Sequence, residues 1–113
     1  MNEEPIVDSG SEKIISLEAE TQFAPNGVVS RTLLRAPNVR VILFGFGQGQ
    51  ELTEHTSSQN ALIQILSGEC EFNLAGKAHP LKSGDVLYMP AGSPHAVRAT
   101  KQFSMLLCLF KTI

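Results

Sequence analysis

Short β-prone runs, separated by glycine, proline, asparagine and serine, make up most of this sequence, and no stretch sustains a helical period of apolar residues. Strands of this length and spacing are typical of a β-sandwich or barrel. Residues 17–20 have room for one helical turn at most. The candidate strands are Lys13–Leu17, Val28–Leu34, Val39–Phe46, Glu51–Thr56, Ala61–Leu66, Cys70–Leu74, Ala78–Leu81, Val86–Met89, His95–Thr100 and Phe103–Lys111. We therefore expect one all-β domain over residues 13–113, preceded by a flexible polar tail over residues 1–12.

Composition narrows the classes of function. The 113 residues carry a formal net charge of −2, and 42% of them are hydrophobic while 18% are charged. This balance suits one domain with a buried core, and it offers no basic surface for nucleic acid or an anionic membrane. The longest apolar run, Met105–Phe110, is too short to span a bilayer. With no apolar signal-peptide core near the N-terminus, we expect a cytoplasmic protein without nucleic-acid or membrane partners.

The two cysteines, Cys70 and Cys108, each lie inside an apolar strand-like run. A cysteine in such a setting usually behaves as a small buried hydrophobic residue. A disulfide is the alternative, but no secretory signal indicates an oxidising compartment. We therefore expect two free thiols without a catalytic role.

The most specific pattern in the chain begins at Gly84. It reads Gly84, five residues, Pro90, one residue, Gly92, two residues and His95. Glycine and proline at such positions make turns at the corners of a barrel, so most of this pattern specifies the fold. Only His95 carries chemistry.

A second pattern lies upstream. Gly49 is followed by five residues and His55, and six residues separate Ala61 from Gly68. In order and spacing, the two stretches resemble the two motifs of the cupin family, with 15 residues between Gly68 and Gly84. The resemblance covers roughly residues 40–111. It implies a double-stranded β-helix, or jelly-roll barrel, similar to the small stand-alone cupins of the conserved-barrel (cupin 2) type.

The resemblance also indicates where a metal would bind. In metal-binding cupins, three histidines and one glutamate converge on a single ion. The matching positions here hold His55, Ser57, Ala61 and His95, and the asparagine that usually ends the second motif is Ala99. Two imidazoles alone would hold a divalent transition metal weakly. A metal at His55 and His95 and a metal-free pocket, in which they hydrogen-bond or transfer protons, are equally favoured.

The rest of the predicted pocket is mostly apolar, a lining that suits a small molecule. Glu51 shares the parity of His55 along its strand, and His79 shares that of Leu81, so each is a further candidate ligand. Ordinary roles, a solvated charge for Glu51 and a polar residue near a turn for His79, are favoured. The predicted pocket residues are Ser57, Gln59, Ala61, Ile63, Val97 and Ala99.

Three functions fit this pattern. The leading one is a small-molecule-binding cupin centred on His55 and His95, with a weakly held divalent metal. The alternatives are a metal-dependent dioxygenase, isomerase or decarboxylase acting on a small oxygenated substrate, and a metal-free binding or sensor module. A second apolar face also predicts a homodimer, because one small barrel cannot cover both faces of these strands. That face comprises Leu62, Leu66, Leu106, Cys108 and Phe110.

Overall fold

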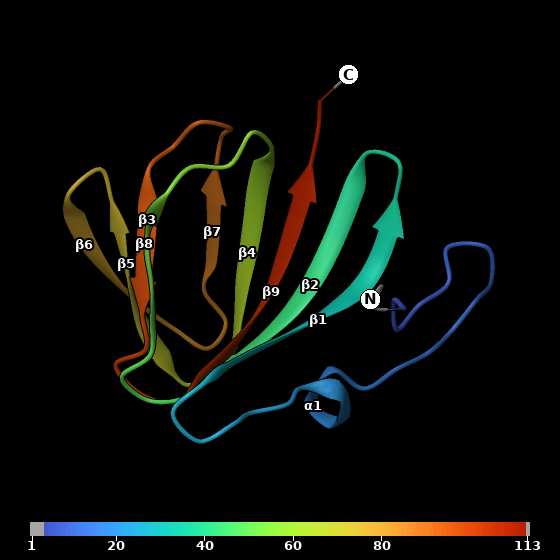
Figure 1. Cartoon of the computed structure of the whole chain (residues 1–113), viewed down its shortest axis with the longest axis horizontal. Helices are drawn as coiled ribbons and strands as arrows, with labels where there is room; N and C mark the ends of the chain where they lie inside the picture. The colour runs from blue at the N-terminus through green and yellow to red at the C-terminus, as the bar shows by residue number, and fades with distance from the viewer. Residues whose placement is uncertain (1–3, 113) are drawn as a thin grey trace.

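Two antiparallel sheets face each other in the computed structural model, which describes residues 4–112 (Figure 1). Within that range, one sheet has five strands in the order β1-β2-β9-β4-β7, and the other has four in the order β3-β8-β5-β6. The elements are α1 (Leu17–Glu20), β1 (Val28–Ala36), β2 (Val39–Phe46), β3 (Glu51–His55), β4 (Asn60–Ser67), β5 (Glu69–Leu74), β6 (Lys77–Lys82), β7 (Val86–Met89), β8 (His95–Arg98) and β9 (Phe103–Phe110). The predicted all-β architecture is confirmed.

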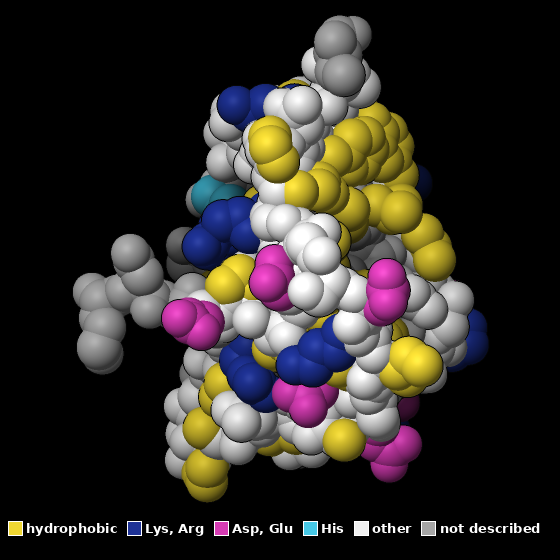
Figure 2. Space-filling view, turned by 90° about the vertical axis from the view of Figure 1, so that its right-hand side faces the viewer, with side chains coloured by type: hydrophobic (Ala, Val, Ile, Leu, Met, Phe, Trp, Pro, Cys, Tyr) yellow, Lys and Arg dark blue, Asp and Glu magenta, His cyan; other side chains and the backbone are white. Residues whose placement is uncertain are grey.

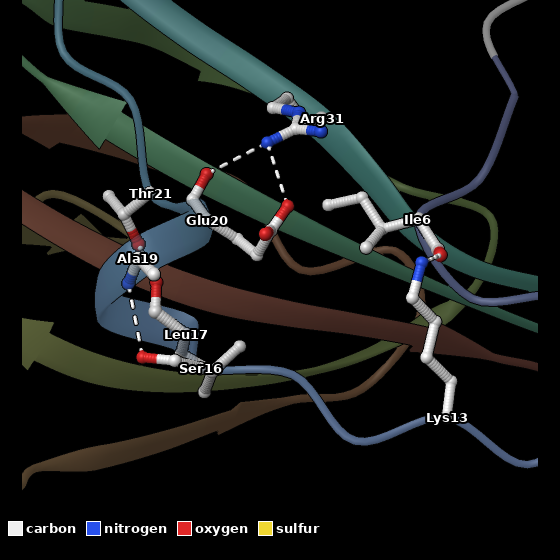
Figure 3. Close-up of polar contacts among 8 residues, drawn as sticks. All are labelled: Ile6, Lys13, Ser16, Leu17, Ala19, Glu20, Thr21 and Arg31. Atoms are coloured by element: carbon white, nitrogen blue, oxygen red, sulfur yellow. Dashed lines mark hydrogen bonds and ion pairs between the residues drawn. The ribbon is translucent and has the colours of Figure 1, made fainter.

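The predicted strand Lys13–Leu17 is wrong. This segment is irregular and leads into the single turn α1, whose N-cap Ser16 accepts a hydrogen bond at its side chain from the Ala19 N–H (3.2 Å). Arg31 on β1 holds the far end of the turn, since its Nη1 donates to the carbonyl oxygen (3.0 Å) and to Oε1 (3.2 Å) of Glu20 (Figure 3). No helix among residues 4–112 has the length and hydrophobicity needed to span a membrane.

The N-terminal segment lies along the free edge of β1. The N–H groups of Ile6 and Val7 donate to the carbonyl oxygens of Thr32 (3.0 Å) and Leu33 (2.7 Å), and Lys13 Nζ donates to the Ile6 carbonyl oxygen (2.8 Å; Figure 3). These bonds satisfy part of an edge that would otherwise be open to another strand. The flexibility of residues 1–12 and the domain bounds stay predictions, and residues 1–3 and 113 lie outside the described range.

The core between the sheets is packed tightly at the end where β2 stops and β9 starts. There the rings of Phe46 and Phe103 stack with centroids 4.5 Å apart, and neither side chain is accessible to solvent. Ile65 on β4 and Cys70 on β5 close the same end and are also fully buried. This end of the barrel, called the closed end below, therefore joins the two sheets.

The outer face of the five-stranded sheet is also apolar, and the segment that precedes β1 covers only part of it. Leu43 is buried on this face, and a Cβ at Gly45 would collide with the carbonyl oxygen of Gln22, so the segment packs directly on the sheet there. Elsewhere on the face, Leu62 and Tyr88 remain 43% and 52% exposed. Hydrophobic side chains gather into one continuous area on the upper part of the molecule (Figure 2).

Candidate functional site

A cavity of about 400 Å³ separates the two sheets at the end opposite the closed end. Its volume lies at the low end of the range typical of small-molecule pockets. The mouth, called the open end below, lies where β3 ends and β8 begins. The lining residues are Phe44, Leu52, His55, Thr56, Ser57, Ser58, Ala61, Ile63, Phe72, His95, Val97, Met105, Leu107 and Leu109.

The two histidines of the sequence motifs meet at this open end. His55 and His95 are directly paired across β3 and β8, and their ring centroids are 4.2 Å apart with an interplanar angle of 58°. His55 is exposed and His95 is half-buried. The predicted proximity of these two residues is therefore present, and both rings line the cavity.

A β-bulge in β3 turns His55 inward. Leu52 pairs with the buried Val97, so its side chain faces the cavity, and the register then shifts before His55 pairs with its partner on β8. The bulge breaks strict alternation and places Leu52 and His55 on the same face. The expectation that Glu51 shares this face is therefore wrong, since Glu51 pairs with the exposed Arg98 on the outside of the sheet.

Hydrogen bonds determine which tautomer each neutral imidazole adopts. Nδ1 of His55 lies 2.8 Å from the Thr53 carbonyl oxygen, and Nδ1 of His95 lies 2.9 Å from that of Ser93. Because a carbonyl oxygen only accepts, each Nδ1 must carry the hydrogen, and each neutral ring then keeps a free lone pair on Nε2. A metal-binding histidine is commonly oriented in this way, with one ring nitrogen donating to a carbonyl oxygen and the other left to bind.

Two loops held to each other form the wall of the mouth. The Gly92 N–H donates to the Ser57 carbonyl oxygen (2.8 Å), and the Ala91 N–H donates to Asn60 Oδ1 (3.0 Å). The Ser57 hydroxyl oxygen accepts from the Gln59 N–H (3.1 Å). The glycine and proline spacing of the second motif thus positions a loop against the chain that follows His55.

The predicted pocket residues divide into two groups. Ser57, Ala61, Ile63 and Val97 line the cavity, whereas Gln59 and Ala99 are not among its lining residues. The side chain of Ala99 is 1% exposed, and its backbone bonds to Gln50 and Gly49 at the base of the barrel. The other low-ranked candidate, His79, pairs with Phe72 on the inner face of the second sheet but does not line the cavity either.

Sequence reasoning missed several apolar lining residues. Alternation along β9 would have found Met105, Leu107 and Leu109, which share one face of that strand. Phe44 and Phe72 carry the same signal on β2 and β5. Leu52, Thr56 and Ser58 carry no such signal, because a bulge and a loop place them.

The donor set at this end is small. Within residues 4–112, no group of three or more histidine, cysteine, aspartate or glutamate side chains is arranged to hold an ion. The Nε2 lone pairs of His55 and His95 suit a borderline divalent metal, and neighbouring hydroxyls or a bound ligand would have to supply the remaining positions. The residues present therefore fit a weakly held ion rather than a site with four protein ligands.

Comparisons with known proteins agree with this architecture. Residues 42–110 match the family model described as a cupin domain, so the chain belongs to the cupin family. An uncharacterised protein of Aquifex aeolicus is 31% identical over 78 residues, a match that spans 69% of this chain and 64% of that protein. The fold is accordingly a cupin double-stranded β-helix.

Solved structures give the same result over nearly the whole chain. A conserved protein of unknown function from Streptococcus pyogenes is 30% identical with a TM-score of 0.85, and the match covers 100% of this chain and 97% of that one. A cupin superfamily protein from Desulfitobacterium hafniense is 27% identical with a TM-score of 0.83, covering 90% and 94% of the two chains. These likenesses identify the type of barrel but no activity.

Proposed function

We propose that this cupin binds a small molecule in the cavity between its sheets, with His55 and His95 as the polar centre. The same two side chains also hold a divalent transition metal weakly in this proposal. The observation that carries it is the shared hydrogen-bond pattern of the two rings, which directs both Nδ1 hydrogens to carbonyl oxygens and leaves both Nε2 lone pairs free. Two unpaired acceptors beside an apolar cavity indicate a site for a ligand rather than a packed core.

Zinc titration tests the metal part of this proposal. We expect metal-free protein to bind one Zn²⁺ weakly by calorimetry, and we expect His55→Ala and His95→Ala each to abolish the binding. His79→Ala is the matched control, since His79 lies outside the cavity and should leave the isotherm unchanged. Equal binding by all four proteins would contradict the proposal, and circular dichroism would verify that each variant is folded.

A binding-only variant tests the small-molecule part. Ala61→Leu fills space in the cavity and leaves both histidines in the sequence, so ligands that stabilise the wild-type protein in a thermal-shift screen should lose their effect. Ligands that stabilise both proteins equally would place binding outside the cavity. As part of the same proposal the protein works in the cytoplasm, a reducing compartment that suits its two free cysteines.

We also propose that the apolar outer face of the five-stranded sheet pairs with a second copy of the chain. On β2, β9, β4 and β7, the positions of outward parity include no aspartate, glutamate, lysine or arginine. In a dimer with two-fold symmetry, the same surface patch of each chain contacts its counterpart on the other chain. Charged residues in such a patch would face like charges, so an uncharged face favours self-association. The dimer would bury Leu62 and Tyr88, which are exposed in the isolated chain.

Light scattering tests the dimer. The wild-type protein should give a dimer mass at micromolar concentration, and Leu62→Lys should give a monomer because it places a charge at the contact. Lys77→Glu is the control, since Lys77 lies on β6 in the other sheet. A monomer mass for the wild-type protein would overturn this part of the proposal.

A further inference from the structure

The lining of the cavity contains no charged side chain. Of the lining residues, two are histidines, three carry hydroxyls and the rest are apolar, with no aspartate, glutamate, lysine or arginine among them. An ionised ligand would lose its hydration there without gaining an opposite charge, which is unfavourable. The cavity therefore disfavours phosphates, carboxylates and ammonium groups when no metal is present.

The hydrogen-bonding groups at the open end are biased toward acceptors. Both Nδ1 hydrogens are used by the Thr53 and Ser93 carbonyl oxygens, so His55 and His95 offer only the Nε2 lone pairs. A ligand satisfies these lone pairs only by bringing hydrogens of its own. His55 is exposed and His95 is half-buried, so water reaches both nitrogens when the site is empty, and a ligand that displaced this water but carried acceptors alone would leave them unpaired.

The hydroxyl of Ser57 complements this arrangement. Its oxygen accepts from the Gln59 N–H at 3.1 Å, so its hydrogen is available to a ligand. A ligand hydroxyl both donates to an imidazole nitrogen and accepts from a serine, which a C–H or an ammonium group does not do. The apolar wall beyond, with Phe44 and Phe72, accommodates a flat hydrocarbon body.

We infer that the ligand of the proposed site is an uncharged, mostly apolar molecule whose single polar head carries hydroxyl hydrogens, with phenols, including catechols, as the class that fits. This inference rests on the proposed function and names the ligand that the cavity would accept. The hydroxyl head lies at the open end between His55, His95 and Ser57. The ring lies between the two sheets, against the side chains of β2 and β5.

Four probes of matched size test this inference on metal-free protein. They are 4-methylphenol, 4-methylbenzoate, 4-methylbenzylammonium and p-xylene, each titrated by NMR at a pH where the acid is ionised and the phenol is neutral. We expect 4-methylphenol to bind at least tenfold more tightly than the two ions and more tightly than p-xylene. Because the single hydroxyl hydrogen of 4-methylphenol reaches one imidazole at a time, the double variant His55→Ala/His95→Ala should remove the preference over p-xylene, whereas His79→Ala should retain it.

Two outcomes would overturn the inference. Binding of the benzoate or the ammonium probe as tight as that of 4-methylphenol would exclude an uncharged ligand class. Equal affinity for 4-methylphenol and p-xylene would show that the histidines do not recognise the hydroxyl of the ligand. In either case a His55- and His95-dependent zinc isotherm, or ligand binding abolished by Ala61→Leu, would leave the proposed function standing. Loss of all of these signals would remove the proposed function as well.

Discussion

The two ends of this barrel are built from similar apolar side chains but have opposite properties. At the closed end, Phe46 and Phe103 stack and exclude solvent completely, and Ile65 seals them from β4. At the open end, Leu107 and Leu109 continue the same face of β9 but border a cavity of about 400 Å³. Because packing at the closed end already joins the two sheets, the open end can contain a cavity and present polar groups.

Deleting a side chain at each end gives the largest expected contrast. Phe103→Ala should lower the free energy of unfolding by about 3–5 kcal/mol, because it removes a fully buried ring and leaves a cavity. Leu109→Ala should cost much less, because Leu109 is only half-buried and already borders empty space. Urea denaturation measures both values, and equal losses would show that the two ends contribute alike to stability.

Enlarging an alanine at each end gives the next contrast. Ala61 and Ala99 are both buried, at 3% and 1% exposure, but only Ala61 lines the cavity. Ala99→Leu should therefore cost about 1–3 kcal/mol through overpacking, whereas Ala61→Leu should be neutral or stabilising. Chemical denaturation of the two variants tests this. A large loss for Ala61→Leu would mean that the open end is packed as tightly as the closed end.

Adding a carboxylate at the open end tests whether the histidine pair binds a metal ion. Ala61 stands where metal-binding cupins carry glutamate, so Ala61→Glu adds a third ligand beside His55 and His95. We expect zinc affinity to rise at least tenfold by calorimetry. Ala61→Gln is the control, since it adds a side chain of similar size without charge. If Ala61→Glu bound zinc no more tightly than the wild-type protein, the two imidazole rings would not be directed at a common metal position in the cavity.

The smallest effect is a pH dependence at the closed end. Burial, with a smaller contribution from the Asp85 charge, raises the pKa of the Cys70 thiol from 9.0 to about 12. Above its ordinary pKa the unfolded chain loses this proton while the folded chain keeps it. The stability due to Cys70 is therefore present below pH 9 and lost as pH rises toward 12, and just above pH 9 the loss stays below about 1 kcal/mol.

Comparison with Cys70→Ala isolates this contribution from other groups that titrate at alkaline pH. The free energy of unfolding of the wild-type protein should fall more steeply above pH 9 than that of the variant. Parallel curves would indicate that the thiol is equally accessible in both states. Thiol labelling of the Leu62→Lys variant, in which the outer face is expected to be uncovered, gives a second readout, since the buried Cys70 should resist modification more than the half-buried Cys108.

Much of this fold was predictable from the sequence, because turn residues fix where each strand ends. The strands from β1 onward lie close to their predicted bounds, and the pairing of His55 with His95 follows from the two motifs. The segment before α1 was mispredicted because its apolar run indicates a strand locally, whereas Ile14 is 99% exposed and Leu17 begins α1. Local pattern carries no information about whether a paired strand lies beside a segment.

The site was predictable only where side chains follow strict alternation. Ile63 and Val97 were found because β4 and β8 alternate regularly around them. Glu51 was placed on the wrong face because the bulge in β3 reverses the alternation within that strand. The Nδ1 hydrogen bonds of the histidines depend on the conformation of the preceding residues, so only the three-dimensional structure gives the tautomers.

The central claim is that the open end presents two imidazoles with free Nε2 lone pairs. Long-range ¹H–¹⁵N spectra of the neutral histidine side chains, recorded in mildly alkaline buffer, test it most directly. We predict that His55 and His95 both give the Nδ1–H pattern, and that the Nε2 signals of both shift when Zn²⁺ is added while those of His79 do not. An Nε2–H pattern in both rings, unchanged by zinc, would contradict the account.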